Sequence, residues 1–306
     1  MFLGTPQWAV PTLAALLASE IEVAAVVTNP DRAAGRGLHG RESPVKRTAI
    51  TAGTPVMQPD RVRDPEFQKD FARLQPDIAC VVAYGKLLPL ELLSVPVLGF
   101  VNAHFSLLPA YRGAAPVQWS LINGDPVTGI SIMVLSEGMD EGPVLATQTV
   151  AVDPSDTAAT LGLRLAEIAA PLLVRTVLDY GDGRLTPTPQ PEQRVSFAPK
   201  LRSEDVRIDW THSAHDIHNL IRGANPEPGA WSTFRAKRMK LFASAHLAVD
   251  AGKPAGHVKL APDGLLVACG TGSLMVTEAQ LEGKRPLPAA ELGRGLHLQE
   301  GDRFDR

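Results

Sequence analysis

The sequence predicts an α/β protein in which a doubly wound, mostly parallel sheet is followed by a small, OB-like β-barrel domain. Three observations predict this fold. Short apolar, β-branched runs alternate with amphipathic stretches in the first half of the chain, as in βαβ units buried on both faces. A polar, proline-rich segment then interrupts the pattern. Beyond it, several short strand-like runs are separated by glycine and proline, which favours a small barrel.

The elements of the first half follow from these runs. Strands are expected at residues 21–28, 77–83, 99–102, 128–135 and 144–150, and helices at residues 9–19, 44–52, 64–74 and 116–123. Pro11 lies near the start of the first helix, where its missing N–H costs little. Ser155-Asp-Thr157 caps a long helix that runs towards Tyr180.

A domain boundary is expected where Pro187, Pro189, Pro191 and Pro199 are spaced through a polar stretch, because such a stretch forms a semi-rigid linker. The predicted domains are therefore residues 1–180 and 204–306, joined by a linker at 181–203. In the second domain we expect one helix and five strands. The helix is expected at 214–222 and the strands at 230–234, 239–245, 256–260, 265–268 and 274–281.

Composition excludes several classes of protein. The chain has 306 residues, with 44% hydrophobic and 21% charged residues, which excludes a disordered, collagen-like or coiled-coil chain. No apolar run is long enough to span a bilayer, so no membrane partner is expected. Cys80 and Cys269 lie far apart in apolar contexts, which favours a reducing, cytoplasmic location. The net charge of −3 means that a nucleic-acid partner would need local basic patches.

The densest group of chemistry-bearing residues closes the predicted strand at 99–102. Asn102 and His104 are two positions apart, so both side chains point to one side of the sheet edge where open α/β sheets bind ligands. An amide donor and an imidazole then converge on one point. The same residues also suit a turn cap and a satisfied, partly buried histidine, and spacing alone does not separate these interpretations.

A glycine-flanked acidic turn, residues 136–142, follows the predicted strand at 128–135. If that strand neighbours the one that bears His104, Asp140 comes close to the imidazole. A carboxylate there favours the charged imidazolium and orients the ring. Ordinary turn chemistry is the alternative role for Asp140.

The block from Asn102 to Pro116, together with Asp140, resembles the folate-dependent formyltransferases. Matching segments run along almost the whole chain: Gly4-Thr-Pro6, Asn29 to Gly37, Ser43 to Lys46, Val82 to Gly85, Phe197 to Leu201, Ile208-Asp-Trp210, Ile221 to Pro226 and Pro228 to Trp231. The central block is shared across that family and indicates the chemistry, whereas the flanking segments indicate the acceptor. The resemblance implies a Rossmann-like catalytic domain followed by an OB-like domain that binds tRNA.

The resemblance also implies a reaction. A formyl group moves from 10-formyltetrahydrofolate, as co-substrate, to the α-amino group of methionine on initiator tRNA, for translation initiation. Asn102 and protonated His104 then stabilise the negative oxygen of the attacked formyl group, and Asp140 takes a proton from the amine. The segment Ser106, Leu107, Leu108 and Pro109 is similar to the family's folate-binding loop. Neither a metal nor a covalent nucleophile is required, and a monomer is expected.

Two basic segments are expected to meet the tRNA. From Asp31 to Arg47, five basic residues oppose two acidic ones; Gly35-Arg36-Gly37 matches the family's tRNA-contacting motif, so Arg36 and Arg41 are the candidates there. From Trp231 to Leu260, six basic residues oppose one acidic residue, and Lys237 and Arg238 are the candidates. Phosphate contacts of this kind give affinity but little sequence information. A solvated basic face is the alternative for both segments.

Other functions compete with this one. A sugar-nucleotide or other small-amine formyltransferase would use the same Asn, His and Asp without RNA. A nucleotide- or RNA-binding module without catalysis would need none of them. A dinucleotide-dependent oxidoreductase is disfavoured because Gly4-Thr-Pro6 lacks the glycine spacing expected after the first strand.

Overall fold

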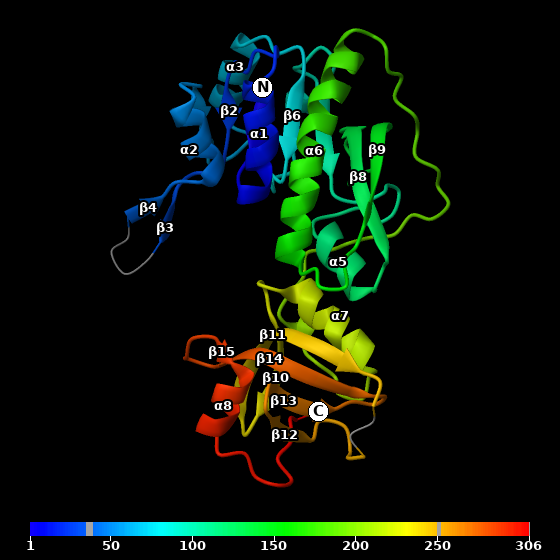
Figure 1. Cartoon of the computed structure of the whole chain (residues 1–306). Coiled ribbons are helices and arrows are strands. Elements are labelled where there is room, and N and C mark those ends of the chain that lie inside the picture. The colour runs from blue at the N-terminus through cyan, green and yellow to red at the C-terminus, as the bar shows by residue number, and fades with distance from the viewer. Residues whose placement is uncertain (35–38, 250–251, 306) are drawn as a thin grey trace. The chain divides into compact units, whose positions relative to one another are not determined.

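The computed structural model describes residues 1–34, 39–249 and 252–305, with the side chains of residues 32–34 and 39–41 outside the description. The chain forms two compact units (Figure 1). The first unit contains residues 1–116, 127–151 and 162–198, and the second contains residues 117–126, 152–161 and 199–306. Two short segments that lie between parts of the first unit in the sequence, residues 117–126 and 152–161, therefore belong to the second unit.

A seven-stranded sheet forms the centre of the first unit, in the order β5-β2-β1-β6-β7-β8-β9. The strands are β1 (Phe2–Gly4), β2 (Val26–Val27), β5 (Val56–Met57), β6 (Ala79–Val82), β7 (Phe100–His104), β8 (Val127–Val134) and β9 (Val144–Ala151). The pairs from β5 to β7 are parallel, whereas β8 and β9 are antiparallel to their neighbours. The prediction of a mostly parallel sheet is confirmed.

The parallel strands are buried on both faces. Leu3, Val27 and Val81 belong to one core cluster, which Phe67 and Phe71 of α3 (Pro65–Arg73) also join. The alternate strand residues Phe2, Val26 and Val82 are equally buried, and alternation directs them to the opposite face. Figure 1 shows α1 (Val10–Leu17) and α6 (Ala158–Gly181) in front of these strands. Helices on both faces explain why the strands read as nearly continuous apolar runs.

The other elements of the first half of the chain are short. They are the 3-10 turn η1 (Gln7–Ala9), the hairpin β3 (Arg32–Ala34) and β4 (His39–Arg41), α2 (Pro44–Thr51), α4 (Leu90–Leu93) and α5 (Pro116–Ile122). Side-chain caps define the starts of two helices: Ser43 accepts from the Lys46 N–H at α2, and Asp64 accepts from the Glu66 N–H at α3. Proline at the first helical position completes both signals.

An antiparallel sheet organises the second unit, in the order β10-β11-β14-β13-β12, with β15 paired to β14. Its strands are β10 (Ala230–Phe234), β11 (Lys237–Leu247), β12 (Val258–Ala261), β13 (Gly264–Ala268), β14 (Ser273–Leu281) and β15 (Leu287–Pro288), and its helices are η2 (Glu204–Val206), α7 (Ala214–Ala224) and α8 (Ala289–Gly295). Residues 302–305 connect the two edges, because Phe304 bridges to Phe234 of β10 and Arg303 bridges to His257, next to β12. The terminal segment thus gives the sheet a barrel-like closure.

The core of the second unit is built around Trp210. Its side chain is fully buried and stacks on Phe304 with ring centroids 4.9 Å apart, and its indole N–H donates to Ser232 Oγ.

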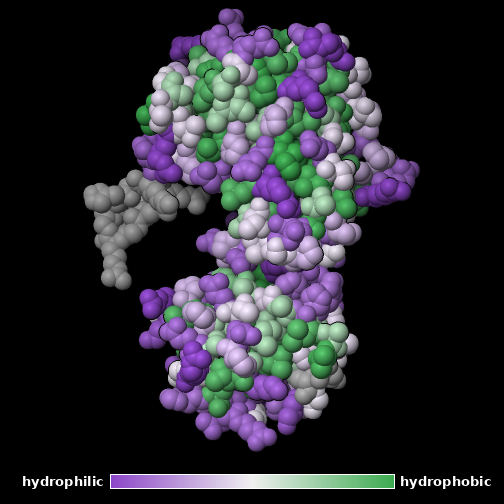
Figure 2. All heavy atoms as spheres, viewed as in Figure 1, coloured by the Kyte–Doolittle hydropathy of each residue, from purple (hydrophilic) through white to green (hydrophobic). Residues whose placement is uncertain are grey.

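In Figure 2 hydrophilic side chains predominate on the visible face of each unit, with apolar ones between them. Within the described residues, no helix combines the length and apolar character needed to cross a membrane.

Some elements differ from those expected. The run at 21–28 forms only the two-residue strand β2, since its first residues lie outside the hydrogen-bonded ladder. The elements α4, α8, β5, β15 and the β3–β4 hairpin were not predicted because they are too short to show a period. Residues 181–198, expected as part of a linker, have their contacts within the first unit.

Candidate active site

Asn102 and His104 lie on β7, where Asn102 pairs with Val81 of β6 and Met133 of β8. His104 is buried, with 5% of its surface exposed, and Asn102 is half-buried. The Asn102 side chain has no hydrogen-bond partner among the described residues. A half-buried amide with free donors suits an acyl oxygen, because it can donate without first breaking a bond within the protein.

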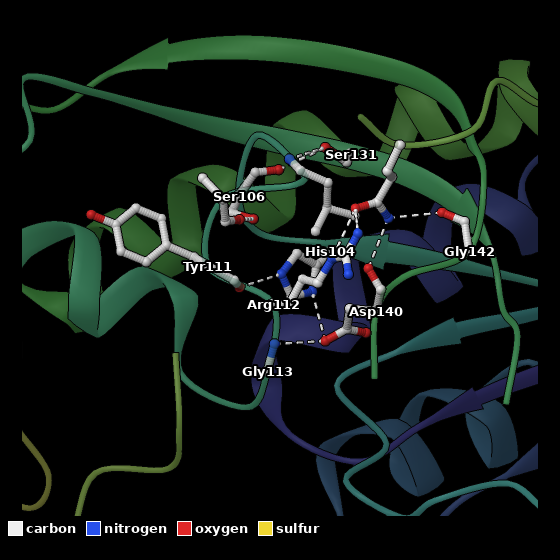
Figure 3. Close-up of polar contacts among 11 residues, drawn as sticks. His104, Ser106, Tyr111, Arg112, Gly113, Ser131, Asp140 and Gly142 are labelled. Atoms are coloured by element: carbon white, nitrogen blue, oxygen red, sulfur yellow. Dashed lines mark hydrogen bonds and ion pairs between the residues drawn. The ribbon is translucent and has the colours of Figure 1, made fainter. Parts of the chain in front are cut away.

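The ring of His104 is held between two oxygens (Figure 3). Its Nε2 lies 2.9 Å from the carbonyl oxygen of Tyr111, and its Nδ1 lies 3.7 Å from Oδ2 of Asp140. Because a carbonyl oxygen only accepts hydrogen bonds, Nε2 carries a proton. The other ring nitrogen therefore faces the carboxylate.

Asp140 reaches His104 by an unexpected path. Neighbouring strand ends were expected to bring the two together, but β8 runs antiparallel to β7, and its last residue, Val134, pairs with Val101 near the start of β7. The loop after β8 leads back to the other end of β7. At Asp140 the backbone turns with φ +51°, a conformation that aspartate tolerates better than most residues. The carboxylate then accepts a 2.8 Å hydrogen bond from the Gly113 N–H.

Gly113 is required for this close packing. Its φ is +127°, and a Cβ at this position would lie 2.6 Å from the carbonyl oxygen of Ala198. Only glycine allows the backbone of residues 112–115 to approach residues 196–198 so closely. The approach places the Gly113 N–H against Asp140.

The predicted folate loop is anchored mainly to the protein itself. Ser106 is fully buried and its hydroxyl donates to the Ala110 carbonyl oxygen at 2.6 Å, while the Ser131 hydroxyl donates to Ser106 O and accepts from the Leu108 N–H (Figure 3). Pro109 is also buried, whereas Leu107 and Leu108 are half-buried. Of these residues, the two leucines retain surface for a ligand.

The basic residues that the sequence predicts to contact tRNA lie in two segments of the chain. Arg36 is outside the described residues, and Arg41 ends β4 with its side chain outside the description. Lys237 and Arg238 are exposed on β11. The guanidinium of Arg238 lies 3.9 Å from the centre of the Trp231 ring, a cation–π contact that orients it.

Lys46, which added to the positive charge of the first basic segment, is already paired. Its ammonium contacts Asp31 at 2.5 Å and Glu42 at 3.4 Å, and the hydrogen bond that it donates to the Asp31 carboxylate raises the pKa of Lys46. Both acidic residues that oppose the basic ones in this segment are therefore engaged by Lys46.

The two cysteines of the chain are poor nucleophiles. Cys80 and Cys269 are buried and unpaired, and burial raises the pKa of both thiols to about 11, so neither is a ready nucleophile. Across the described ranges, no group of three His, Cys, Asp or Glu side chains is placed to hold a metal ion.

Sequence reasoning missed the residues that connect the site to the segment after α6. The Gln190 amide donates to the carbonyl oxygens of Asp140 and Gly142, both at 2.8 Å, and Ser196 Oγ accepts from the Tyr111 N–H at 2.9 Å. These partners are separated by 48 to 85 positions, so no local pattern connects them. A lone glutamine among prolines carries no recognisable signal.

An α/β sheet that carries an amide, an imidazole and a carboxylate near the end of β7, followed by a small antiparallel unit, suits an enzyme that transfers an acyl group. The comparisons agree with this class. Residues 1–177 match the model of the formyl transferase family, and residues 200–297 match that of the formyl transferase C-terminal domain. The chain belongs to the formyl transferase family.

Relatives and solved structures extend this result. A methionyl-tRNA formyltransferase of Streptomyces coelicolor is 45% identical over 304 residues, covering 99% of this chain and 98% of the relative. One of Thermobifida fusca is 46% identical with the same coverage. The solved sugar 3N-formyl transferase WlaRD, determined in the presence of dTDP and 5-N-formyl-THF, superposes with a TM-score of 0.68 at 16% identity, covering 93% of this chain and 97% of that one. At that identity the superposition shows the shared fold alone.

Proposed function

We propose that this chain transfers a formyl group from 10-formyltetrahydrofolate to the α-amino group of methionine carried by initiator tRNA, in the cytoplasm, for translation initiation. The single observation that carries the chemistry is the convergence of Asp140, Gly113 and His104, with Asn102 two positions before His104 on β7. The acceptor is supported by relatives named methionyl-tRNA formyltransferases that match across 99% of the chain.

The donor is supported by the chemistry of the site. Asn102 offers unpaired amide N–H donors, and Leu107 and Leu108 offer half-buried apolar surface next to β7, which suits a formyl group attached to an aromatic heterocycle. A folate derivative was also present with the related fold of WlaRD. When bound, the donor supplies a formyl carbon on a nitrogen leaving group. We propose Ser106, Leu107, Leu108 and Pro109 as its loop, with the serine and proline shaping the loop from within.

Asn102 and His104 would stabilise the charge that develops on the formyl oxygen as the amine adds. Nε2 of His104 lies at hydrogen-bond distance from the Tyr111 carbonyl oxygen and Nδ1 faces the Asp140 carboxylate 3.7 Å away, so a ring protonated on both nitrogens would meet an oxygen at each. A positive ring beside an amide N–H lowers the energy of a developing oxyanion more than that of the starting amide. One well-placed donor of this kind contributes about 3 to 4 kcal/mol.

Asp140 would accept the proton that the attacking amine loses. The new bond joins the amine nitrogen to the formyl carbon, the bond to the departing nitrogen breaks, and that nitrogen gains a proton in return. The hydrogen bond from Gly113 keeps one carboxylate oxygen in place for this role. The reaction balances with one proton moved, which a single carboxylate can hold.

The acceptor tRNA would meet the basic residues. We propose Arg36 and Arg41 in the first unit, and Lys237 and Arg238 in the second, as phosphate contacts. Arg238 lies on the Trp231 ring, which also has the guanidinium of Arg207 at 5.7 Å from its centre. A tryptophan that orders two exposed guanidinium groups presents fixed positive charge suited to a polyanion. A monomer is sufficient for this arrangement.

The experiment is a direct assay of acceptors. The purified chain is given 10-formyltetrahydrofolate and either methionyl initiator tRNA or a nucleotide-linked amino sugar, and formyl transfer is measured for each. Transfer to the tRNA is expected. A preference for the amino sugar would instead assign the chain to the sugar-nucleotide formyltransferases, and full activity of the His104→Ala variant would remove the proposed site.

A further inference from the structure

Residues 187–198 form a strap over the candidate site. Thr188 exchanges two 2.8 Å backbone hydrogen bonds with Val144, just beyond the Asp140 loop. Further along, Ser196 and Ala198 bond to the backbone of Arg112, and the Ala198 carbonyl oxygen accepts from the Ala115 N–H. The strap therefore contacts both segments that meet at Asp140: the loop that carries it and the backbone that donates to it.

Gln190 lies between these two ends of the strap, and its amide is fully used. Its Nε2 donates to the carbonyl oxygens of Asp140 and Gly142, both at 2.8 Å, and its Oε1 accepts from Nε and Nη2 of Arg112, at 3.0 and 2.8 Å. The guanidinium only donates and the carbonyls only accept, so the amide has a single satisfactory orientation. One side chain thus bonds to the Asp140 loop on one side and to the residue before Gly113 on the other.

We propose that Gln190 is a positioning residue for catalysis, acting through the carboxylate of Asp140. It holds the carbonyl of the residue that would take the proton, and it fixes Arg112, whose neighbour Gly113 donates to the same carboxylate. The left-handed backbone of Asp140, with φ +51°, costs free energy even for aspartate, and the contacts of Gln190 with this loop offset part of that cost. This inference rests on the proposed role of Asp140.

The two sides of the amide can be tested separately. Gln190→Leu removes all four hydrogen bonds. Gln190→Glu keeps an acceptor for Arg112 but places a carboxylate oxygen against the carbonyls of Asp140 and Gly142. Gln68→Leu is the matched control, since the Gln68 amide makes a single 3.2 Å hydrogen bond to Val62 O on the distant helix α3.

The measurements are kcat and KM for methionyl initiator tRNA and 10-formyltetrahydrofolate, with urea unfolding of each variant. We expect both Gln190 variants to lose about 10- to 100-fold in kcat with little change in either KM, because a carboxylate displaced by about 1 Å loses its alignment. Gln68→Leu should keep the wild-type kcat. Equal kcat for Gln190→Glu and wild type would overturn the proposal.

A double-mutant cycle with Asp140→Asn distinguishes positioning from a general structural role. If Gln190 acts through Asp140, Gln190→Leu should lower single-turnover rates by less than threefold in the Asp140→Asn background, since the group it positions is gone. The same loss in both backgrounds would contradict the proposal even if Gln190→Leu is slow. Failure of the wild-type chain to formylate the tRNA would count against the proposed function, whereas a slow Asp140→Asn with a fast Gln190→Leu would count against this inference alone.

Discussion

The Nδ1 of His104 and Oδ2 of Asp140 lie 3.7 Å apart, beyond the roughly 2.7–3.2 Å of an N–H···O hydrogen bond. The same carboxylate oxygen is 2.8 Å from the Gly113 N–H, so Asp140 is anchored to the backbone rather than to the ring. The carboxylate therefore keeps capacity for another partner. An attacking amine that approaches His104 and Asp140 together would fill that capacity.

Replacing Asp140 with Asn tests this capacity. The amide keeps the size of the side chain but cannot take a proton from the amine, so kcat should fall by about 10²- to 10⁴-fold. Folate binding should remain within a few-fold, as measured by fluorescence titration with a folate analogue. Loss of the folded state in the same variant would make Asp140 a structural residue.

Asn102→Ala should separate catalysis from stability. The Asn102 side chain has no hydrogen-bond partner among the described residues, so its loss should leave the free energy of unfolding almost unchanged while kcat falls by about 10²- to 10³-fold. Asn219→Ala is the contrasting variant, because buried Asn219 accepts from Nε of Arg222 at 2.9 Å. That variant should lose stability instead, and a large loss of stability in Asn102→Ala would be inconsistent with a free amide.

Gly113→Ala should weaken both fold and activity. The added Cβ would lie 2.6 Å from the Ala198 carbonyl oxygen, so the strap must move, at a cost of about 2 to 4 kcal/mol. Gly53→Ala is the control: Gly53 also has a positive φ, +71°, but nothing lies within 4 Å of its Cβ position, so only about 1 kcal/mol should be lost. Urea unfolding measures both values, and equal losses would show that the contact with Ala198 does not matter.

His218 should make stability depend on pH. Burial lowers the pKa of His218 to about 4, with the nearby charges of Arg222, His246 and His215 adding to the shift. In the unfolded chain the pKa is about 6.5, so the unfolded state takes up the proton first as the pH falls. The stabilisation is thus complete above pH of about 6.5 and is lost between that value and about 4.

We expect this loss to be about 1 to 2 kcal/mol, because the ring is only half-buried and solvent screens part of the effect. The measurement is the difference in unfolding free energy between wild type and His218→Gln at several pH values. The difference should shrink as the pH falls from 7.5 to 5. A constant difference would show that His218 is not held neutral.

Arg238→Ala should reduce the salt dependence of tRNA binding. Removing one proposed phosphate contact should lower the slope of log K against log salt by about one, while the proposed folate site, formed by the other unit, should keep its affinity. Arg73→Ala is the control, because Arg73 is exposed on α3 and paired with Asp70. An unchanged slope for Arg238→Ala would place the tRNA elsewhere.

Much of this molecule was predictable from local patterns. Period and capping residues located the larger elements within a few residues, including α2, α3 and α7, because a buried stripe and a cap are local properties. The placement of Asn102 and His104 on one strand was predicted in the same way, because side chains alternate between the two faces of a strand.

The sequence by itself thus determined the fold class, the two types of sheet and the identity of the candidate residues. The tertiary structure alone decided that β8 runs antiparallel to β7, that Asp140 returns to His104 through a loop, and that Gln190 supports it from a segment expected as a linker. The tertiary structure also decided that Phe304 bridges to Phe234 and so helps to connect the two edges of the second sheet. The physical reason is that strand direction and these hydrogen bonds depend on contacts between distant segments, whose cost in chain entropy is repaid only when the whole unit packs.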